Sequence, residues 1–297
     1  MPVNAVRVPP DRPRLLIGTH TFAAEGDSAR RQAAGVASLC ALGGVEIVNV
    51  QFERRPHHAD GLPTLPVLRG TSNDIAGRSG PTKPIMSEMF DALAAHAASR
   101  NLASFCFTNA DIIFSQDAVA WMLSAPRDAF VLSRQDFDGR TGTPATMEVA
   151  GTDVFAISTR WWAANRTRFR PYIAGEGGWD NIYTAVLLCH GDAVLENRRP
   201  LVRHEIHPPG PMPSPQFGEY VRMLCALDAR YFSLWCTYWD GLLRLRTAKA
   251  GADEEAAWAR EVFVWKPTPG ERLFQAGRNV KARLRYRWWK LRAGEGS

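Results

Sequence analysis

The sequence lacks any long apolar run, which excludes a segment able to cross a membrane as a helix. A spanning helix needs about 20 consecutive apolar residues, whereas stretches such as residues 184–189 are only as long as a buried strand. Residues 1–14 contain four prolines and no apolar core, so they do not resemble a secretory signal. We therefore expect a cytoplasmic protein that does not cross a bilayer.

Cysteines are few and follow no pairing pattern. The chain has five, an odd number, and no two of them form a C-x-x-C pair. A secreted disulfide framework normally has an even number at regular spacings. We therefore expect reduced thiols in the core. Internal repeats and low-complexity tracts are also absent from the sequence.

The charge is close to balanced except near the C-terminus. There are 36 basic and 30 acidic residues, a net charge of +6 at pH 7. Residues 278–292 alone carry seven basic residues and no acidic one, which exceeds the whole net charge. The rest of the chain offers no concentration of positive charge for nucleic acid, so we expect no nucleic-acid partner.

The apolar pattern predicts an α/β fold with a mostly parallel central sheet flanked by helices. Apolar runs at 14–19 and 45–52 read as strands on either side of a helix at 27–42, and such a β-α-β unit places its strands in parallel. Strands and helices continue to alternate, which is typical of a helix-covered sheet. The other expected strands are 104–108, 129–133, 153–158, 193–195 and 201–204, and the expected helices are 84–99, 116–124 and 178–190.

Residues 53–84 are rich in Pro, Gly, Arg and His, and are longer than the connections that compact domains normally use. We interpret this stretch as an active-site loop. The expected organisation is a flexible N-terminus at 1–13, an α/β domain at 14–208 and a helical C-terminal extension at 209–297.

The first candidate motif is Asn109-Ala110-Asp111, directly after the expected strand 104–108. Ligands of open α/β sheets bind beyond the carboxyl ends of the strands. Side chains two residues apart in an extended stretch point the same way, so Asn109 and Asp111 can together hold a divalent cation or a diphosphate. The alternative is that Asp111 caps the next helix or belongs to a turn.

The second motif, residues 177–181, reads Gly-Gly-Trp-Asp-Asn at the start of an expected helix. Trp179 offers a flat face to a sugar or base, and Asp180 is placed as a general base. Alternatively, Asp180 is a helix N-cap and Trp179 makes a hydrophobic contact beside it.

The third motif is His204-Glu-Ile-His207. A neutral imidazole can complete a metal shell, but on an extended segment the two rings would point to opposite faces. At most one ring is then expected to face the site. The alternative is a pair of surface loop residues.

Taken in order, these motifs and Gly151-Thr-Asp153-Val-Phe resemble bacterial GT-A-type nucleotide-sugar transferases, a group within the family 2-like glycosyltransferases. The resemblance covers about residues 14–208. It implies a GT-A fold and a hexosyltransferase-like enzyme that moves a sugar from a nucleotide-sugar donor to a hydroxyl acceptor. A carbohydrate or lipid-linked acceptor would place it in polysaccharide or glycolipid assembly.

The resemblance also implies roles for individual residues. Asn109 and Asp111 stand at the family's D-x-D motif, where Asp111 and His204 would bind Mg²⁺ or Mn²⁺. Because Asn109 replaces the first carboxylate, the charge at the metal is reduced by one. Asp180 would deprotonate the acceptor and give inversion at the anomeric carbon. The remaining residues expected to contact substrates are Thr19 and His20 at the nucleotide, Asp153 near the acceptor, and Trp179 and Asn181 on either side of the general base Asp180.

Two cations of the long loop, Arg78 and Lys83, are expected to contact phosphate groups. The alternative is that both are solvated surface charges.

An amphipathic helix is expected near the C-terminus, because apolar residues recur at spacings of three and four. They are Leu273, Ala276, Val280, Leu284, Trp288 and Leu291. Two interpretations fit. In the first, basic residues 278–292 and the tryptophans rest on an anionic membrane surface. In the second, the helix docks on its own domain with a solvated basic face.

Two other functions remain as alternatives to the transferase. A metal-dependent hydrolase or phosphodiesterase would use Asp111, Asp180 and His204, but no H-x-H or H-D spacing in the sequence gives a dense ligand cluster. A non-catalytic sugar-nucleotide-binding protein is the other alternative, and Asn109 is the feature that favours it.

Overall fold

The computed structural model describes residues 15–77, 80–208 and 214–294. Within the last helix, the side chains of 282–283, 285–286, 289–290 and 292–294 are outside this description. The chain forms two compact units, each assembled from three segments. The first comprises Met1–Arg69, Met89–Arg166 and Ala193–Pro208, and the second comprises Gly70–Glu88, Thr167–Asp192 and Pro209–Ser297. The predicted flexible segment 1–13 lies outside the described residues.

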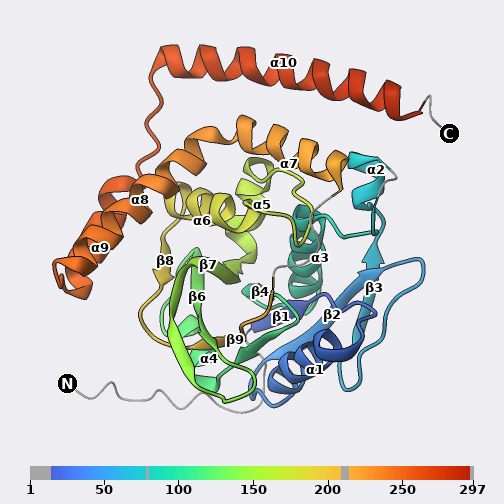
Figure 1. Ribbon diagram of the computed structural model, residues 1–297, viewed down its shortest axis with the longest axis vertical. Coiled ribbons are helices and arrows are strands. Elements are labelled where there is room, and N and C mark those ends of the chain that lie inside the picture. Colours follow the sequence, from blue (N-terminus) through green and yellow to red (C-terminus); the bar gives the residue numbers. More distant parts are fainter. Residues whose placement is uncertain (1–14, 78–79, 209–213, 295–297) are drawn as a thin grey trace. The chain divides into compact units, whose positions relative to one another are not determined.

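The first unit contains one nine-stranded sheet (Figure 1). Its strands in chain order are β1 (Leu15–Thr19), β2 (Glu46–Phe52), β3 (Thr64–Leu68), β4 (Ser104–Thr108), β5 (Ile112–Phe114), β6 (Ala129–Phe137), β7 (Pro144–Ser158), β8 (Ala193–Glu196) and β9 (Val202–Glu205). The spatial order is β3-β2-β1-β4-β7-β6-β9-β5, with β8 also paired to β6. Among the described strands, β7 runs antiparallel to β4 and β6, β5 runs antiparallel to β9, and the other pairings are parallel.

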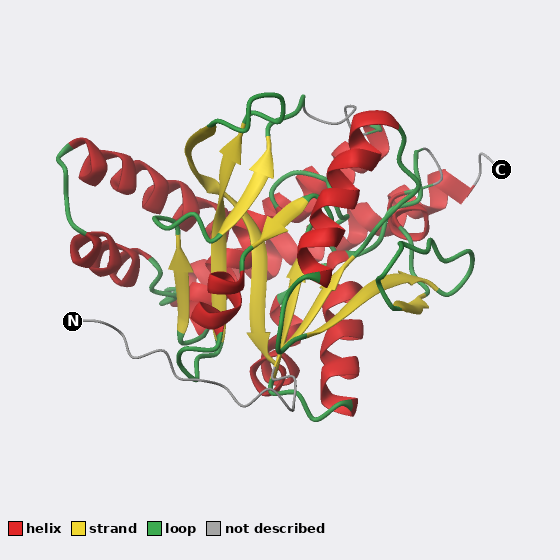
Figure 2. Ribbon diagram, turned by 90° about the horizontal axis from the view of Figure 1, so that it is seen from below, coloured by secondary structure: helices red, strands yellow, loops and turns green. Residues whose placement is uncertain are grey.

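Helices cover both faces of this sheet (Figure 2). On one face, α1 (Gly26–Cys40) and α4 (Gln116–Met122) pack on a core that includes Leu39, Val119 and Cys106 of β4. On the other, α3 (Met86–Ser99) and α5 (Thr159–Asn165) supply Phe90 and Trp162, whose rings lie 5.9 Å from that of Phe105. The alternation along β4 follows from the strand geometry that sends successive side chains to opposite faces.

The second unit is helical. It contains α2 (Ser72–Ala76), α6 (Trp179–His190), α7 (Pro215–Leu227), α8 (Ala229–Thr247), α9 (Ala252–Val262) and α10 (Pro269–Gly294), with a 3₁₀ helix at Arg166–Arg168 where the units join in sequence. A buried carboxylate helps to hold it, since Asp228 accepts hydrogen bonds from Arg170 at 2.6 Å and Tyr172 at 3.0 Å. None of the described helices is long and apolar enough to span a membrane.

The observed elements confirm the predicted fold class: an α/β protein with a mostly parallel sheet flanked by helices, and a helical C-terminal part. The interpretation of 53–84 as one long loop is wrong, because this stretch contains β3 and α2. Pro66 obscured the strand, but β3 lies at the end of the strand order, where a residue without an N–H is tolerated. Thr71 and Asp74 begin α2 with a capping box.

All five cysteines are free, as expected. Their expected burial in the core is correct for Cys106, but Cys40 and Cys236 are exposed. Apolar neighbours in the sequence did not identify the exposed positions, because successive residues of a helix point in different directions.

Candidate metal centre

The loop between β4 and β5 is held in place by a close approach of α1. A Cβ atom at Gly35 would lie 2.2 Å from the backbone oxygen of Ala110, so only glycine lets the helix pack this tightly on the loop. Ile112 of β5 then pairs with His204 of β9 in the antiparallel ladder. This register brings together Asp111 and His204, which are 93 positions apart in the sequence (204 − 111).

Asp111, His204 and His207 form a group whose ligand atoms all lie within 4.8 Å of one another. The Oδ2 atom of Asp111 is 3.6 Å from Nε2 of His204 and 3.5 Å from Nε2 of His207. The two Nε2 atoms are 3.2 Å apart. The prediction that only one ring would face the site is therefore wrong. Strand β9 ends at Glu205, so the alternation of an extended chain does not continue to His207.

These distances suit a shared metal ion. Ligands about 2.1 Å from a metal lie about 3.0 Å apart at an octahedral right angle and about 3.4 Å apart at a tetrahedral angle. The three observed separations lie close to these values. One carboxylate and two imidazoles favour Mn²⁺ or another first-row transition metal over Mg²⁺, which prefers oxygen ligands.

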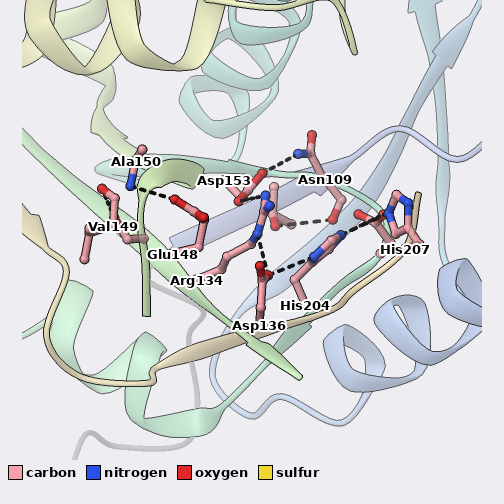
Figure 3. Close-up of polar contacts among 12 residues, drawn as sticks. Asn109, Arg134, Asp136, Glu148, Val149, Ala150, Asp153, His204 and His207 are labelled. Atoms are coloured by element: carbon pink, nitrogen blue, oxygen red, sulfur yellow. Dashed lines mark hydrogen bonds and ion pairs between the residues drawn. The ribbon is translucent and has the colours of Figure 1, made fainter. Parts of the chain in front are cut away.

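A second carboxylate orients His204 (Figure 3). Nδ1 of His204 lies 3.1 Å from Oδ1 of Asp136, and since an ionised carboxylate only accepts, Nδ1 is the donor. Neutral His204 therefore has its lone pair on Nε2, the atom that faces Asp111 and His207. A carboxylate behind a histidine is the usual support for a histidine metal ligand.

Arg134 connects this support to the loop after β4 (Figure 3). Its Nε donates to Asp136 at 2.9 Å, and a terminal nitrogen donates to Asp153 at 2.7 Å. The other oxygen of Asp153 accepts from the amide of Asn109 at 2.8 Å. Asn109 and Asp153 are thus bonded to each other, and neither belongs to the group of three.

The electrostatics of the group favour charged Asp111. Burial acts to raise the pKa of Asp111, but His204, a backbone hydrogen bond and the charge of His207 together outweigh it, and the pKa lies below its ordinary value. For His204, burial is the largest single influence and acts to lower the pKa, but the interaction with Asp111 and the negative charges of Asp111 and Asp153 together outweigh it, so the pKa is raised. A metal ion must therefore compete with a proton on His204.

The predicted nucleotide contacts lie at the carboxyl end of β1. Thr19 is fully buried, and among the described residues its hydroxyl has no hydrogen-bond partner. Nδ1 of His20 lies 2.7 Å from the backbone oxygen of Val50, and burial lowers the pKa of His20. Because β1 and β4 are parallel neighbours, their carboxyl ends lie side by side. Thr19 is the last residue of β1 and Asn109 is the first residue after β4.

The predicted residues Trp179, Asp180, Asn181 and Lys83 belong to the second unit. Arg78 lies outside the described residues. Trp179 is 5% exposed and meets Tyr183 edge-on, which fits the interpretation as a hydrophobic contact better than a sugar-stacking face. The N-cap of α6 is Gly178, so Asp180 lies in the first turn and is not the cap; Asn181 follows it. Lys83 forms an ion pair at 2.7 Å with buried Glu176, which corrects its interpretation as a solvated charge.

Three residues of the site are absent from the predicted set: His207, Arg134 and Asp136. A signal for two of them exists in the sequence. Strand Ala129–Phe137 begins with apolar residues and ends with polar ones. Arg134 and Asp136 are two residues apart in its polar half, so they share a face. His207 belongs to the third motif, but an extended chain would turn its ring to the face opposite that of His204.

No family model and no curated protein matches this sequence. Among solved structures, the chain is similar to residues 1–349 of S. aureus TarS, with a TM-score of 0.44 and 12% sequence identity. The match covers 72% of this chain and 65% of that chain, so this protein spans less than two thirds of the solved one. A similarity of this size carries no functional argument.

Proposed function

We propose that this chain is a glycosyltransferase that uses a divalent cation held by Asp111, His204 and His207. The observation that supports this proposal is the group of three. Its carboxylate, Asp111, lies in the loop after β4, beside the carboxyl end of the parallel strand β1. Open α/β sheets bind ligands at this edge. The fold class and the order of the sequence motifs agree with the proposal, while the GT-A subtype stays a prediction.

The chemistry of sugar transfer explains why a cation is useful here. An acceptor oxygen forms a bond to the anomeric carbon while the bond to the diphosphate breaks, so negative charge builds on the leaving group. A bound cation would stabilise that charge. Asp111, His204 and His207 hold the cation in this proposal, and Asp136 keeps His204 in the tautomer that can bind it. The proton of the acceptor hydroxyl goes to a carboxylate, for which Asp180 stays the prediction.

A panel of nucleotide sugars tests the proposal. Thermal shift with UDP, GDP, CMP and dTDP sugars, with and without Mn²⁺, should give stabilisation by one nucleotide that Mn²⁺ increases. Turnover with a hydroxyl acceptor should then release the nucleoside diphosphate. NMR of the product tests the predicted inversion separately. Failure of every donor to stabilise the protein in the presence of Mn²⁺ contradicts the proposal.

A metal-dependent phosphodiesterase is a second candidate, and one observation favours it. The spacing in the sequence gives no dense ligand cluster for a hydrolase, but the fold brings Asp111, His204 and His207 together into one. Hydrolysis of a simple phosphodiester in the presence of Mn²⁺, without any sugar transfer, would select this candidate. Stabilisation by a sugar nucleotide without any turnover would instead select a non-catalytic binding protein.

The acceptor is part of the same proposal. We propose a carbohydrate or lipid-linked hydroxyl and no nucleic acid. Cytoplasmic residence stays a prediction.

A further inference from the structure

Helix α10 (Figure 1, red) carries a stripe of apolar side chains that are exposed to solvent. Leu273 is 77% exposed, Leu284 60% and Leu291 68%. Val280 and Trp288 are also more than half exposed. These five residues, which we call the α10 stripe, follow one another at intervals of seven, four, four and three. At about 100° per residue they occupy one face of the helix.

Two hydrogen bonds that join α10 to α7 come from residues outside the stripe. The amide of Gln275 donates to the backbone oxygen of Leu227 at 2.6 Å, and the guanidinium of Arg278 donates to the backbone oxygen of Ala226. Both acceptors lie in the last turn of α7. A helix that merely docks on its own domain buries its apolar face, because that burial drives the docking. Here polar residues make the hydrogen bonds to α7, and the five residues of the α10 stripe are each more than half exposed.

The charge of the helix identifies the chemistry of its partner. Seven basic residues and no acidic one lie between 278 and 292, and the described cations Lys281 and Arg287 are exposed. Long basic side chains beside an apolar face can reach the headgroups of anionic lipids while the apolar residues enter the acyl boundary. The stripe runs along 19 residues of helix from Leu273 to Leu291, a rise of about 27 Å, all of it on one face.

We propose that α10 lies in the plane of an anionic membrane surface, with the α10 stripe inserted and the basic residues beside it, such as Lys281 and Arg287, at the headgroups. This inference does not depend on the reaction that the first unit catalyses. An enzyme with this surface would work on a substrate held at the membrane.

Vesicle sedimentation with the full chain tests the inference. Wild-type protein should sediment with vesicles of phosphatidylcholine and phosphatidylglycerol and much less with phosphatidylcholine alone, and added salt should weaken the binding. The double variant Leu284→Ser/Leu291→Ser should need at least about tenfold more lipid for half-maximal binding, because two large apolar side chains no longer insert.

A matched variant controls for a general loss of surface apolarity. Phe232 and Leu243 are exposed apolar residues of α8, 43% and 46% exposed, and do not belong to the stripe. Phe232→Ser/Leu243→Ser should bind vesicles as the wild type does. The inference is wrong if wild-type protein ignores anionic vesicles, or if both double variants bind equally. It is also wrong if the stripe variant merely turns a dimer into a monomer in light scattering, because the stripe would then be a protein interface.

Discussion

The group of three and the α10 stripe are opposite kinds of surface. Asp111, His204 and His207 are polar, partly buried and close to one another, and they come from loops and a strand far apart in the sequence. The α10 stripe is apolar, exposed and made by one helix. Local periodicity is enough to find the stripe, whereas the group of three depends on the pairing of β5 with β9. The first has the ligand set of a metal site, and the second has the pattern of a membrane-binding helix.

The largest expected effect comes from breaking the polar network that supports the group of three. Arg134→Met would leave Asp136 and the nearly buried Asp153 without their cation. Removing one partner of a buried ion pair typically costs about 3–5 kcal/mol in the free energy of unfolding. Urea unfolding should show this loss.

The matched control for Arg134→Met comes from α10. Arg287 is an exposed cation, so Arg287→Met should change the free energy of unfolding by no more than about 0.5 kcal/mol. Equal costs for the two variants would remove the distinction between the regions.

The next effect concerns the group of three directly. Asp111→Ala removes its only carboxylate, and Mn²⁺-dependent activity should fall at least about 100-fold, since even substitutions behind a metal ligand cost 10–100-fold. Asp117, an exposed aspartate in the first turn of α4, supplies the control variant Asp117→Ala. Vesicle binding should be unchanged in both. Full activity of Asp111→Ala in a steady-state assay would argue against a catalytic metal at this group.

A smaller effect is expected one step further from the metal. Asp136→Asn keeps the shape of the side chain but removes the charge that orients His204, and Mn²⁺ affinity should fall about 10–100-fold. Calorimetric titration measures this change. An unaltered affinity would mean that His204 is positioned by packing alone.

The last effect, away from both surfaces, is a pH dependence in the second unit. Burial lowers the pKa of His190 to about 4, and its Nε2 lies 2.9 Å from the hydroxyl of Tyr231. In the unfolded chain this pKa is about 6.5. The unfolded state therefore binds more protons between these values, so His190 favours folding above pH 6.5 and this contribution is lost as the pH falls towards 4. The Tm of His190→Gln should decline less than that of the wild type over this range.

Much of the fold was predictable because the apolar pattern is local. The strand at 104–108 and the helix that follows 178 appear where the sequence placed them. The stretch 53–84 was not, since Pro66 interrupts the apolar pattern of β3 and only its place at the sheet edge permits that proline.

The site was predictable in part. Asp111 and His204 were predicted because one follows an expected strand and the other stands at the end of one. The role of Arg134 between Asp136 and Asp153 could not be derived, because it depends on the pairing of β6 with β7 and β9. The inclusion of His207 depends on the point where β9 stops, which the sequence does not mark.

Binding of Mn²⁺ to the group of three is the central claim, and a titration followed by electron paramagnetic resonance tests it most directly. We expect wild-type protein to bind one equivalent of Mn²⁺. His207→Ala should bind it at least about tenfold more weakly, as expected for the loss of a metal-binding side chain. Absence of binding by the wild type, or equal binding by wild type and His207→Ala, would contradict the account.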